Sequence, residues 1–133
     1  LDYIGWIFGL PVTHKAFCRS KSSLAIDAID YAKYLLFYKD FTCDITLNYF
    51  RRDYKREIEI LFESVTWKVD LAKNSITDSK GFVIFQSEQR GADTYTEQMR
   101  YFFDLVSNNE QDSFNDIIFA NEMLKLCLDY ERP

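Results

Sequence analysis

The feature that most constrains the fold of this 133-residue chain is a change of hydrophobic period along its length. Residues 41–49 alternate between apolar and polar side chains, with Cys43, Ile45 and Leu47 on one side and Thr46 on the other. Such period-two alternation is typical of a strand that is buried on one face only. Runs of similar character predict further strands at residues 12–19, 30–38, 56–62, 65–69, 74–77 and 82–86. Hairpin turns are predicted at Lys39-Asp40 and at residues 78–81, and the break in alternation over residues 51–55 predicts a loop. The middle of the chain is therefore predicted to form one meander of roughly five or six antiparallel strands.

The C-terminal third changes to a helical period. Residues 94–106 place Tyr95, Met99 and Phe102 on one face of a helix, and Asp93 precedes them as a candidate N-cap. A second helix is predicted over residues 113–130. The expected apolar face of this second helix consists of Ile117, Ala120, Leu124, Cys127 and Leu128.

The N-terminal segment also has helical spacing. Ile4, Ile7 and Phe8 share one face, and the residues Gly9-Leu10-Pro11 provide a stop signal. Because the chain starts within this helix and without a Met, we expect it to be a fragment of a longer protein. Strands followed by helices predict an α+β fold, in which helices pack on one face of an open, mainly antiparallel β-sheet. We expect residues 1–133 to form a single domain.

Composition limits the classes of partner. Hydrophobic residues make up 47% of the chain and aromatic residues 17%, which predicts a folded domain rather than a disordered segment. The formal net charge is -5, and a general nucleic-acid binder needs a basic face, so no nucleic-acid partner is expected. No apolar run approaches the ~20 residues of a membrane-spanning helix, so no membrane partner is expected either.

Few residues offer catalytic or metal-binding chemistry. His14 is the only histidine and has no Cys or second His at ligand spacing, which predicts a surface or half-buried residue and no metal site. Cys18, Cys43 and Cys127 match neither a disulfide framework nor a zinc spacing, which favours buried thiols in a reducing, cytoplasmic setting. A Gly-rich phosphate loop is absent from the sequence, so a complete nucleotide-binding site is not expected in these residues.

Residues 47–63, LNYFRRDYKREIEILFE, carry a local excess of cations in this acidic chain. The candidate substrate-binding residues combine aromatic and cationic side chains: Tyr49, Arg51, Arg52, Tyr54 and Arg56. Arginine pairs bidentately with carboxylate or phosphate, and tyrosine stacks on or hydrogen-bonds to a sugar. The same segment also fits a solvated loop whose cations pair with Asp53, Glu57 and Glu59. The residue types leave both interpretations open.

Three segments follow one another in a recognisable order: LDYIGWIFGLP, IDAIDYAKYLLFYKDFTCDITLNYFRR and YKREIEILFESVTWKVD. This succession resembles the C-terminal domain of the glucose–fructose oxidoreductase / inositol dehydrogenase / MocA (Gfo/Idh/MocA) family. Members carry a helix with His-x-x-Asp, an apolar stretch and Trp-Leu-Phe-Gly, followed by strands, an arginine-bearing loop and an Arg-x-x-Glu-Ile strand. The resemblance covers nearly the whole chain and implies an α+β domain with an open antiparallel sheet.

Carried over to this sequence, the resemblance implies that Asp2 matches the Asp of His-x-x-Asp. Trp6, Phe8 and Gly9 then match the end of that helix. The family's catalytic histidine would fall three residues before Asp2, and its partner lysine belongs to a separate N-terminal Rossmann domain. No catalytic residue is therefore expected in this chain.

The resemblance also implies a role in substrate contacts and subunit assembly within an NAD(P)-dependent oxidoreductase acting on a sugar or nucleotide-sugar. NAD or NADP would bind the full-length protein, and we expect the isolated chain to bind no cofactor and to be inactive. The implied partners are the missing Rossmann domain, a sugar-like small molecule and further copies of the chain, in a dimer or other homo-oligomer formed through the sheet face. Two alternatives are a stand-alone small-ligand binding module and a dimerisation module, both of α+β type.

Overall fold

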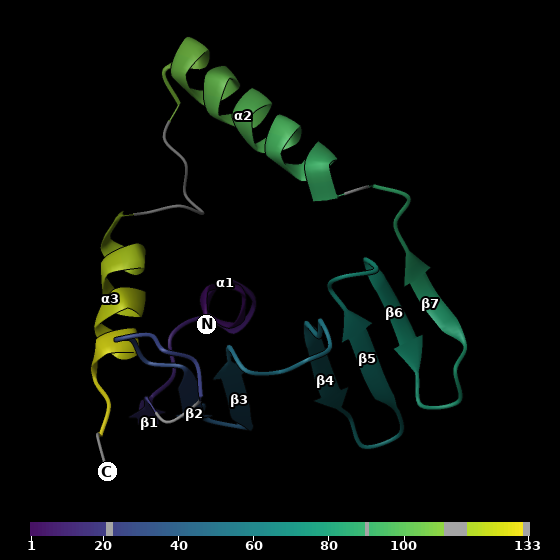
Figure 1. Ribbon diagram of the computed structural model, residues 1–133. Coiled ribbons are helices and arrows are strands. Elements are labelled where there is room, and N and C mark those ends of the chain that lie inside the picture. Colours follow the sequence, from purple (N-terminus) through teal and green to yellow (C-terminus); the bar gives the residue numbers. More distant parts are fainter. Residues whose placement is uncertain (21–22, 90, 111–116, 132–133) are drawn as a thin grey trace. The chain divides into compact units, whose positions relative to one another are not determined.

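The computed structural model describes residues 1–20, 23–89, 91–110 and 117–131, and these residues form an α+β fold. Within them lie three helices and seven strands, and the strands make two separate antiparallel sheets (Figure 1). The chain divides into two compact units, one of residues 1–52 and 112–133 and one of residues 53–111. Each unit contains one of the two sheets.

The first unit is built on a three-stranded sheet. Its strands are β1 (Thr13–Arg19), β2 (Tyr31–Phe37) and β3 (Thr42–Asn48), paired in that order. The hairpin between β2 and β3 turns at Lys39 and Asp40, where the Tyr38 N–H donates to the Phe41 carbonyl at 2.9 Å. The rings of Tyr38 and Phe41 stack with their centroids 4.4 Å apart. The turn predicted at Lys39 and Asp40 is therefore confirmed.

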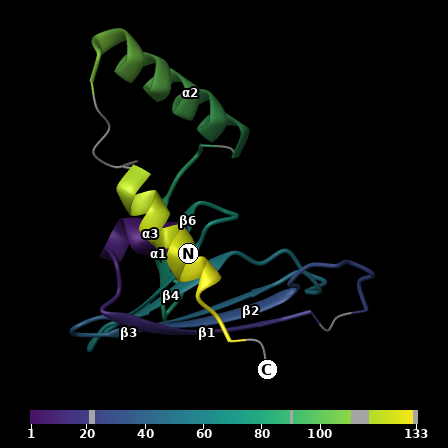
Figure 2. The same cartoon turned by 90° about the vertical axis from the view of Figure 1, so that its left-hand side faces the viewer.

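Two helices of this unit, α1 (Asp2–Phe8) and α3 (Ile117–Leu128), lie on the same face of the sheet (Figure 2). They contact each other at Gly5 and Met123, and a Cβ atom placed on Gly5 would lie only 2.5 Å from Met123 Sδ. Burial alternates along β2, as expected for a strand that is covered on one face. The buried apolar side chains of the described residues are Ile4, Ala16, Cys18, Ala32, Tyr34, Leu36, Met123 and Leu126.

The face of α3 that packs inward differs from the predicted one. Ile117 and Leu124, both expected inside, are exposed, whereas Met123 and Leu126 are buried. The predicted face is wrong because α3 is apolar around most of its circumference, so the spacing of apolar residues does not select one side. The inward face of α3 is instead determined by the close approach of Gly5 to Met123. Residues 113–116 of the predicted helix lie outside the described part of the chain.

The second unit is built on a four-stranded meander. Its strands, in spatial order, are β4 (Glu57–Leu61), β5 (Thr66–Asp70), β6 (Ser75–Asp78) and β7 (Val83–Gln86). Asp70 Oδ1 accepts the N–H groups of Ala72 and Lys73, both at 3.0 Å, and these backbone hydrogen bonds lower the pKa of Asp70. Gly81, with a φ of 86°, closes the turn after Asp78, where the sequence predicts a hairpin. Asp78 Oδ1 accepts the N–H groups of Lys80 at 2.9 Å and Phe82 at 2.8 Å. The β5–β6 and β6–β7 turns are therefore each stabilised by an aspartate side chain.

Helix α2 (Gly91–Asn108) also belongs to the second unit. The apolar side chains predicted along it, including Tyr95, Met99 and Phe102, are each more than half exposed. The helix begins at Gly91, so Asp93 lies within its first turn. The prediction that Asp93 is the N-cap is therefore wrong, although a carboxylate in the first turn still interacts favourably with the helix dipole.

The predicted single meander is wrong at one connection. Strands β3 and β4 follow each other in the sequence but belong to different sheets. Alternation identifies a strand and its buried face, but it does not identify the neighbouring strand when the connection is longer than a tight hairpin turn. The connection concerned, residues 49–56, contains the candidate substrate-binding residues.

Candidate functional site

The candidate substrate-binding residues all lie on the loop that connects β3 and β4: Tyr49, Arg51, Arg52, Tyr54 and Arg56. Every residue from 49 to 56 is exposed, and Tyr54 reaches 80% exposure. The loop predicted from the break in alternation is therefore confirmed. The boundary between the two units falls within this loop, after Arg52. The five residues thus divide between the units, with Tyr49, Arg51 and Arg52 in the first and Tyr54 and Arg56 in the second.

The first half of the loop is anchored to the three-stranded sheet. The Asn48 side-chain oxygen accepts the N–H of Arg51, three residues further along the chain, at 3.0 Å. The Phe50 ring stacks on Tyr31 of β2, with ring centroids 6.3 Å apart and planes inclined by 23°. These contacts tie residues 48–51 to the first sheet.

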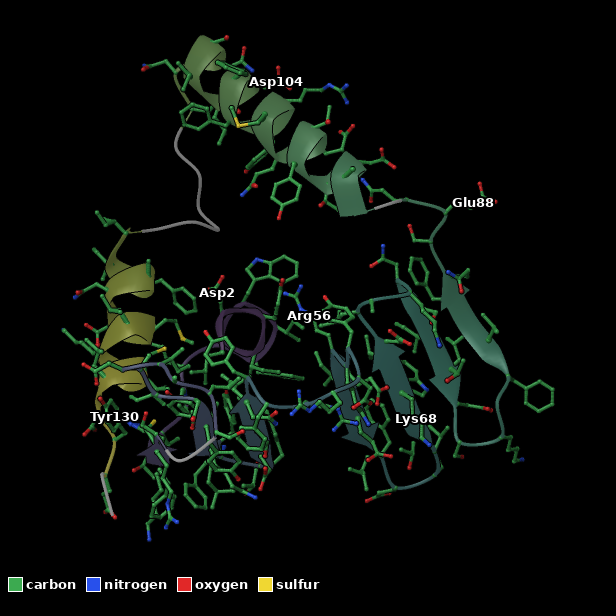
Figure 3. All side chains as sticks on the ribbon, in the orientation of Figure 1. Asp2, Arg56, Lys68, Glu88, Asp104 and Tyr130 are labelled. Atoms are coloured by element: carbon green, nitrogen blue, oxygen red, sulfur yellow. The ribbon has the colours of Figure 1, made fainter. Side chains whose placement is uncertain are left out.

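The second half of the loop leads directly into β4, where Figure 3 labels Arg56. The Arg56 carbonyl accepts the N–H of Leu71 at 2.9 Å, so its backbone is already part of the second sheet's hydrogen bonding. Lys55 Nζ lies 2.8 Å from Glu57 Oε2. This ion pair is one that the solvated-loop interpretation predicts, and an exposed pair of this type contributes only about 0–1 kcal/mol. The other cations of the loop are Arg51, Arg52 and Arg56.

Asp2, the candidate motif residue, lies in the first turn of α1 and is exposed (Figure 3). A carboxylate at this position interacts favourably with the positive end of the helix dipole. Burial raises the pKa of the Cys127 thiol, and the Asp2 carboxylate raises it further. The N-terminal amino group acts in the opposite direction and lowers the pKa of Cys127.

A buried polar cluster of the first unit was not found by sequence reasoning. The Tyr34 hydroxyl donates to the Cys127 carbonyl at 3.1 Å and lies 3.9 Å from Cys18 Sγ. Burial raises the pKa of Tyr34 far beyond its usual value, and burial also raises the pKa of the Cys43 and Cys127 thiols. Burial thus disfavours the thiolate, which is the nucleophilic form of a cysteine, at Cys43 and Cys127. Tyr34 and Cys127 are 93 positions apart, and no local pattern indicates their contact.

His14 joins β1 to the residue that follows the last turn of α3. Its Nε2 atom lies 3.3 Å from the Asp129 carbonyl oxygen and 3.4 Å from Asp129 Oδ2. The His14 side chain is 18% exposed, in agreement with the predicted half-buried residue. Its partner is 115 positions away, so the sequence alone could not identify it.

Within the part of the chain that the structure describes, no group of three or more His, Cys, Asp or Glu residues could hold a metal ion. Among the described helices, none has both the length and the apolar composition needed to cross a membrane.

Comparisons with protein-family models, with curated proteins and with solved structures gave no match for this chain. The loop between β3 and β4 offers guanidinium and phenol groups, which are suited to binding a ligand.

Proposed function

We propose that this chain is the substrate-side and assembly domain of an NAD(P)-dependent oxidoreductase that acts on a sugar or nucleotide-sugar. The residues that it contributes to sugar recognition are Tyr49, Arg51, Arg52, Tyr54 and Arg56. The nicotinamide cofactor and the catalytic lysine belong to a Rossmann part of the same protein, and the catalytic histidine lies three residues before Asp2. Hydride transfer between the nicotinamide and a sugar carbon is the chemistry that the cofactor supplies. The isolated chain binds neither NAD nor NADP and does not turn over substrate.

The observation that carries this proposal is the order of motifs along the chain. The helix from Asp2 to Phe8, the strands that end at Asn48 and the strand that begins after Arg56 occur in an order that resembles a Gfo/Idh/MocA C-terminal domain. The α+β fold, with two antiparallel sheets and with α1 and α3 on one face of the first, supports the proposal at the level of fold class. The exposed arginines support ligand binding, because guanidinium groups bind carboxylate and phosphate in bidentate geometry.

A cytoplasmic location is part of the same proposal. All three cysteines lie in described positions and are free thiols: Cys18, Cys43 and Cys127. Free thiols that are buried or half-buried suit a reducing compartment. Cys18 is part of the buried core of the first unit, and Cys43 and Cys127 are half-buried in the same unit.

Steady-state kinetics of the complete oxidoreductase would test the proposal. Neutral sugars, sugar phosphates, uronic acids and nucleotide-sugars are each offered with NAD⁺ and with NADP⁺. We expect one of these classes to support nicotinamide reduction. For that substrate, Arg51→Gln and Arg56→Gln should raise KM more than they lower kcat, because they remove ground-state contacts.

Lys68→Gln is the matched control, since Lys68 is an exposed cation on β5, away from the loop in sequence. It should leave KM unchanged. Absence of nicotinamide reduction with every class of sugar would contradict the proposal. An equal effect of Lys68→Gln and the arginine variants on KM would contradict the assignment of the loop.

A dimerisation module is the second candidate, because the described part of the second unit exposes large apolar side chains on two elements. Strand β7 exposes Ile84 and Phe85, and helix α2 exposes Phe102 and Phe103. Large exposed apolar patches commonly mark protein interaction surfaces. Light scattering over a range of concentrations tests this role, and a strict monomer at the highest concentration counts against it.

A further inference from the structure

The outer edge of β1 is covered by the residues that follow α3. We propose that these residues, Asp129, Tyr130 and Glu131, form an edge strap that prevents β1 from pairing with the β1 strand of a second copy of the chain. Figure 1 shows this segment running beside β1, and Figure 3 labels Tyr130 within it. The inference concerns assembly of the first unit and is independent of the proposed sugar site.

The backbone contacts of the strap occupy the middle of the β1 edge. Backbone groups alternate in direction along a strand, so the even-numbered residues of β1 direct their N–H and C=O groups away from β2. The Glu131 N–H donates to the Ala16 carbonyl at 2.9 Å, and the Cys18 N–H donates to the Glu131 carbonyl at 3.3 Å. Together these two bonds form a parallel bridge between Glu131 and Phe17.

A side-chain contact extends the strap to the next edge position. His14 is the remaining even-numbered residue of β1, and its Nε2 atom lies 3.3 Å from the Asp129 carbonyl and 3.4 Å from Asp129 Oδ2. The Asp129 N–H in turn donates to the Lys125 carbonyl at 3.0 Å, continuing the hydrogen bonds of α3. The helix therefore delivers the strap to the edge, and His14, Ala16 and Cys18 each contact it.

Strand β1 would otherwise be a suitable edge for self-association. An unpaired strand edge is a template for a strand of another molecule. Two β1 strands related by a twofold axis would run antiparallel, and pairing centred on Ala16 would place Lys15 opposite Phe17 and Thr13 opposite Arg19. No like charges would face each other directly in this register, so charge does not oppose the pairing. The strap is the element that prevents it.

Replacing Glu131 with proline tests the strap with little other change. Proline has no N–H, so Glu131→Pro removes the donor to the Ala16 carbonyl. Glu131→Ala keeps that donor and is the matched control, because the Glu131 side chain is exposed. Hydrogen exchange of the Cys18 amide is measured at low protein concentration, and the mass in solution is measured by light scattering as the concentration rises.

In the Glu131→Pro protein we expect the Cys18 amide to exchange about tenfold faster, in line with the net contribution of one hydrogen bond. We also expect the mass of the Glu131→Pro protein to rise with protein concentration, over a range in which the masses of the parent and of Glu131→Ala stay constant. At the highest concentrations the Cys18 amide should again be protected from exchange. Unchanged exchange, unchanged mass, or a mass increase without renewed Cys18 protection would each overturn the proposal.

Circular dichroism shows whether the proline variant keeps its helices. If it does not, Asp129→Ala gives the same two tests, because it removes the carboxylate near His14 while leaving the backbone bonds of Glu131 in place. Smaller changes in the same direction are then expected for both Cys18 exchange and mass. No change in either would overturn the proposal.

Discussion

The effect of Gly5→Ala depends directly on the contact between α1 and α3. In an isolated helix this change would stabilise by about 0.8–1.0 kcal/mol, since alanine has the higher helix propensity. Here the new Cβ atom would lie 2.5 Å from Met123 Sδ, 2.9 Å from Met123 Cε and 3.1 Å from Phe119 Cζ. Overpacking of this kind costs about 1–3 kcal/mol, so we expect a net loss of roughly 0–2 kcal/mol in the free energy of unfolding.

Truncating Met123 should remove most of the steric overlap with a Cβ atom at position 5. In a Met123→Ala background, Gly5→Ala is expected to be neutral or to stabilise by up to about 1 kcal/mol. The coupling free energy between the two substitutions is then about 1–3 kcal/mol. It would be measured by urea unfolding of the parent, the two single variants and the double variant. Ile7→Ala, at an exposed position of α1, should have the same cost in both backgrounds. Equal effects of Gly5→Ala in the two backgrounds would refute the contact as described.

Two further predictions concern single hydrogen-bonding groups. Tyr34→Phe removes the donor to the Cys127 carbonyl and should lower the free energy of unfolding by about 1–2 kcal/mol in urea, whereas unchanged stability would contradict that bond. The folded-state pKa of Asp70 is lowered chiefly by the hydrogen bond from the Lys73 N–H. The ionised Asp70 carboxylate therefore stabilises the folded protein above the unfolded-state pKa of about 3.9. This contribution is lost as the pH falls through the lower folded-state pKa. Asp70→Asn should therefore flatten the stability profile below about pH 4, and a profile as steep as that of the parent would contradict the turn geometry.

The strands and turns could be predicted because their signals are local. Alternation over residues 41–49 is confirmed by β3, and the turn at Lys39 and Asp40 is confirmed by the hydrogen bond that closes it. Gly9 follows the last residue of α1 with a φ of 76°, a conformation that favours glycine. Gly81 serves the same purpose before β7. In each case the residue type and its immediate neighbours contain the information.

The packing could not be predicted because it depends on residues far apart in the sequence. The inward face of α3 is set by Gly5 on α1, and His14 meets Asp129 across 115 positions. The separation of β3 from β4 likewise depends on strand partners that alternation does not specify. None of these contacts leaves a periodic signal in the sequence.

In the candidate site, too, the local features could be predicted from the sequence and the long-range contacts could not. Exposure of the arginine–tyrosine loop follows from its break in alternation, and the ion pair between Lys55 and Glu57 follows from their proximity in sequence. The stacking of Phe50 on Tyr31 required the pairing of β2 with β3. The division of the loop between two units, after Arg52, has no counterpart in residue type or spacing.

The most direct test of the central claim is a fluorescence titration with NADH and NADPH of two samples, the isolated 133-residue chain and the complete oxidoreductase that we propose it belongs to. We predict saturable binding of at least one of these nucleotides to the complete protein and none to the isolated chain. Tight binding to the isolated chain would contradict the account, because the nicotinamide site would then lie within these residues. Absence of binding to the complete protein would contradict it as well.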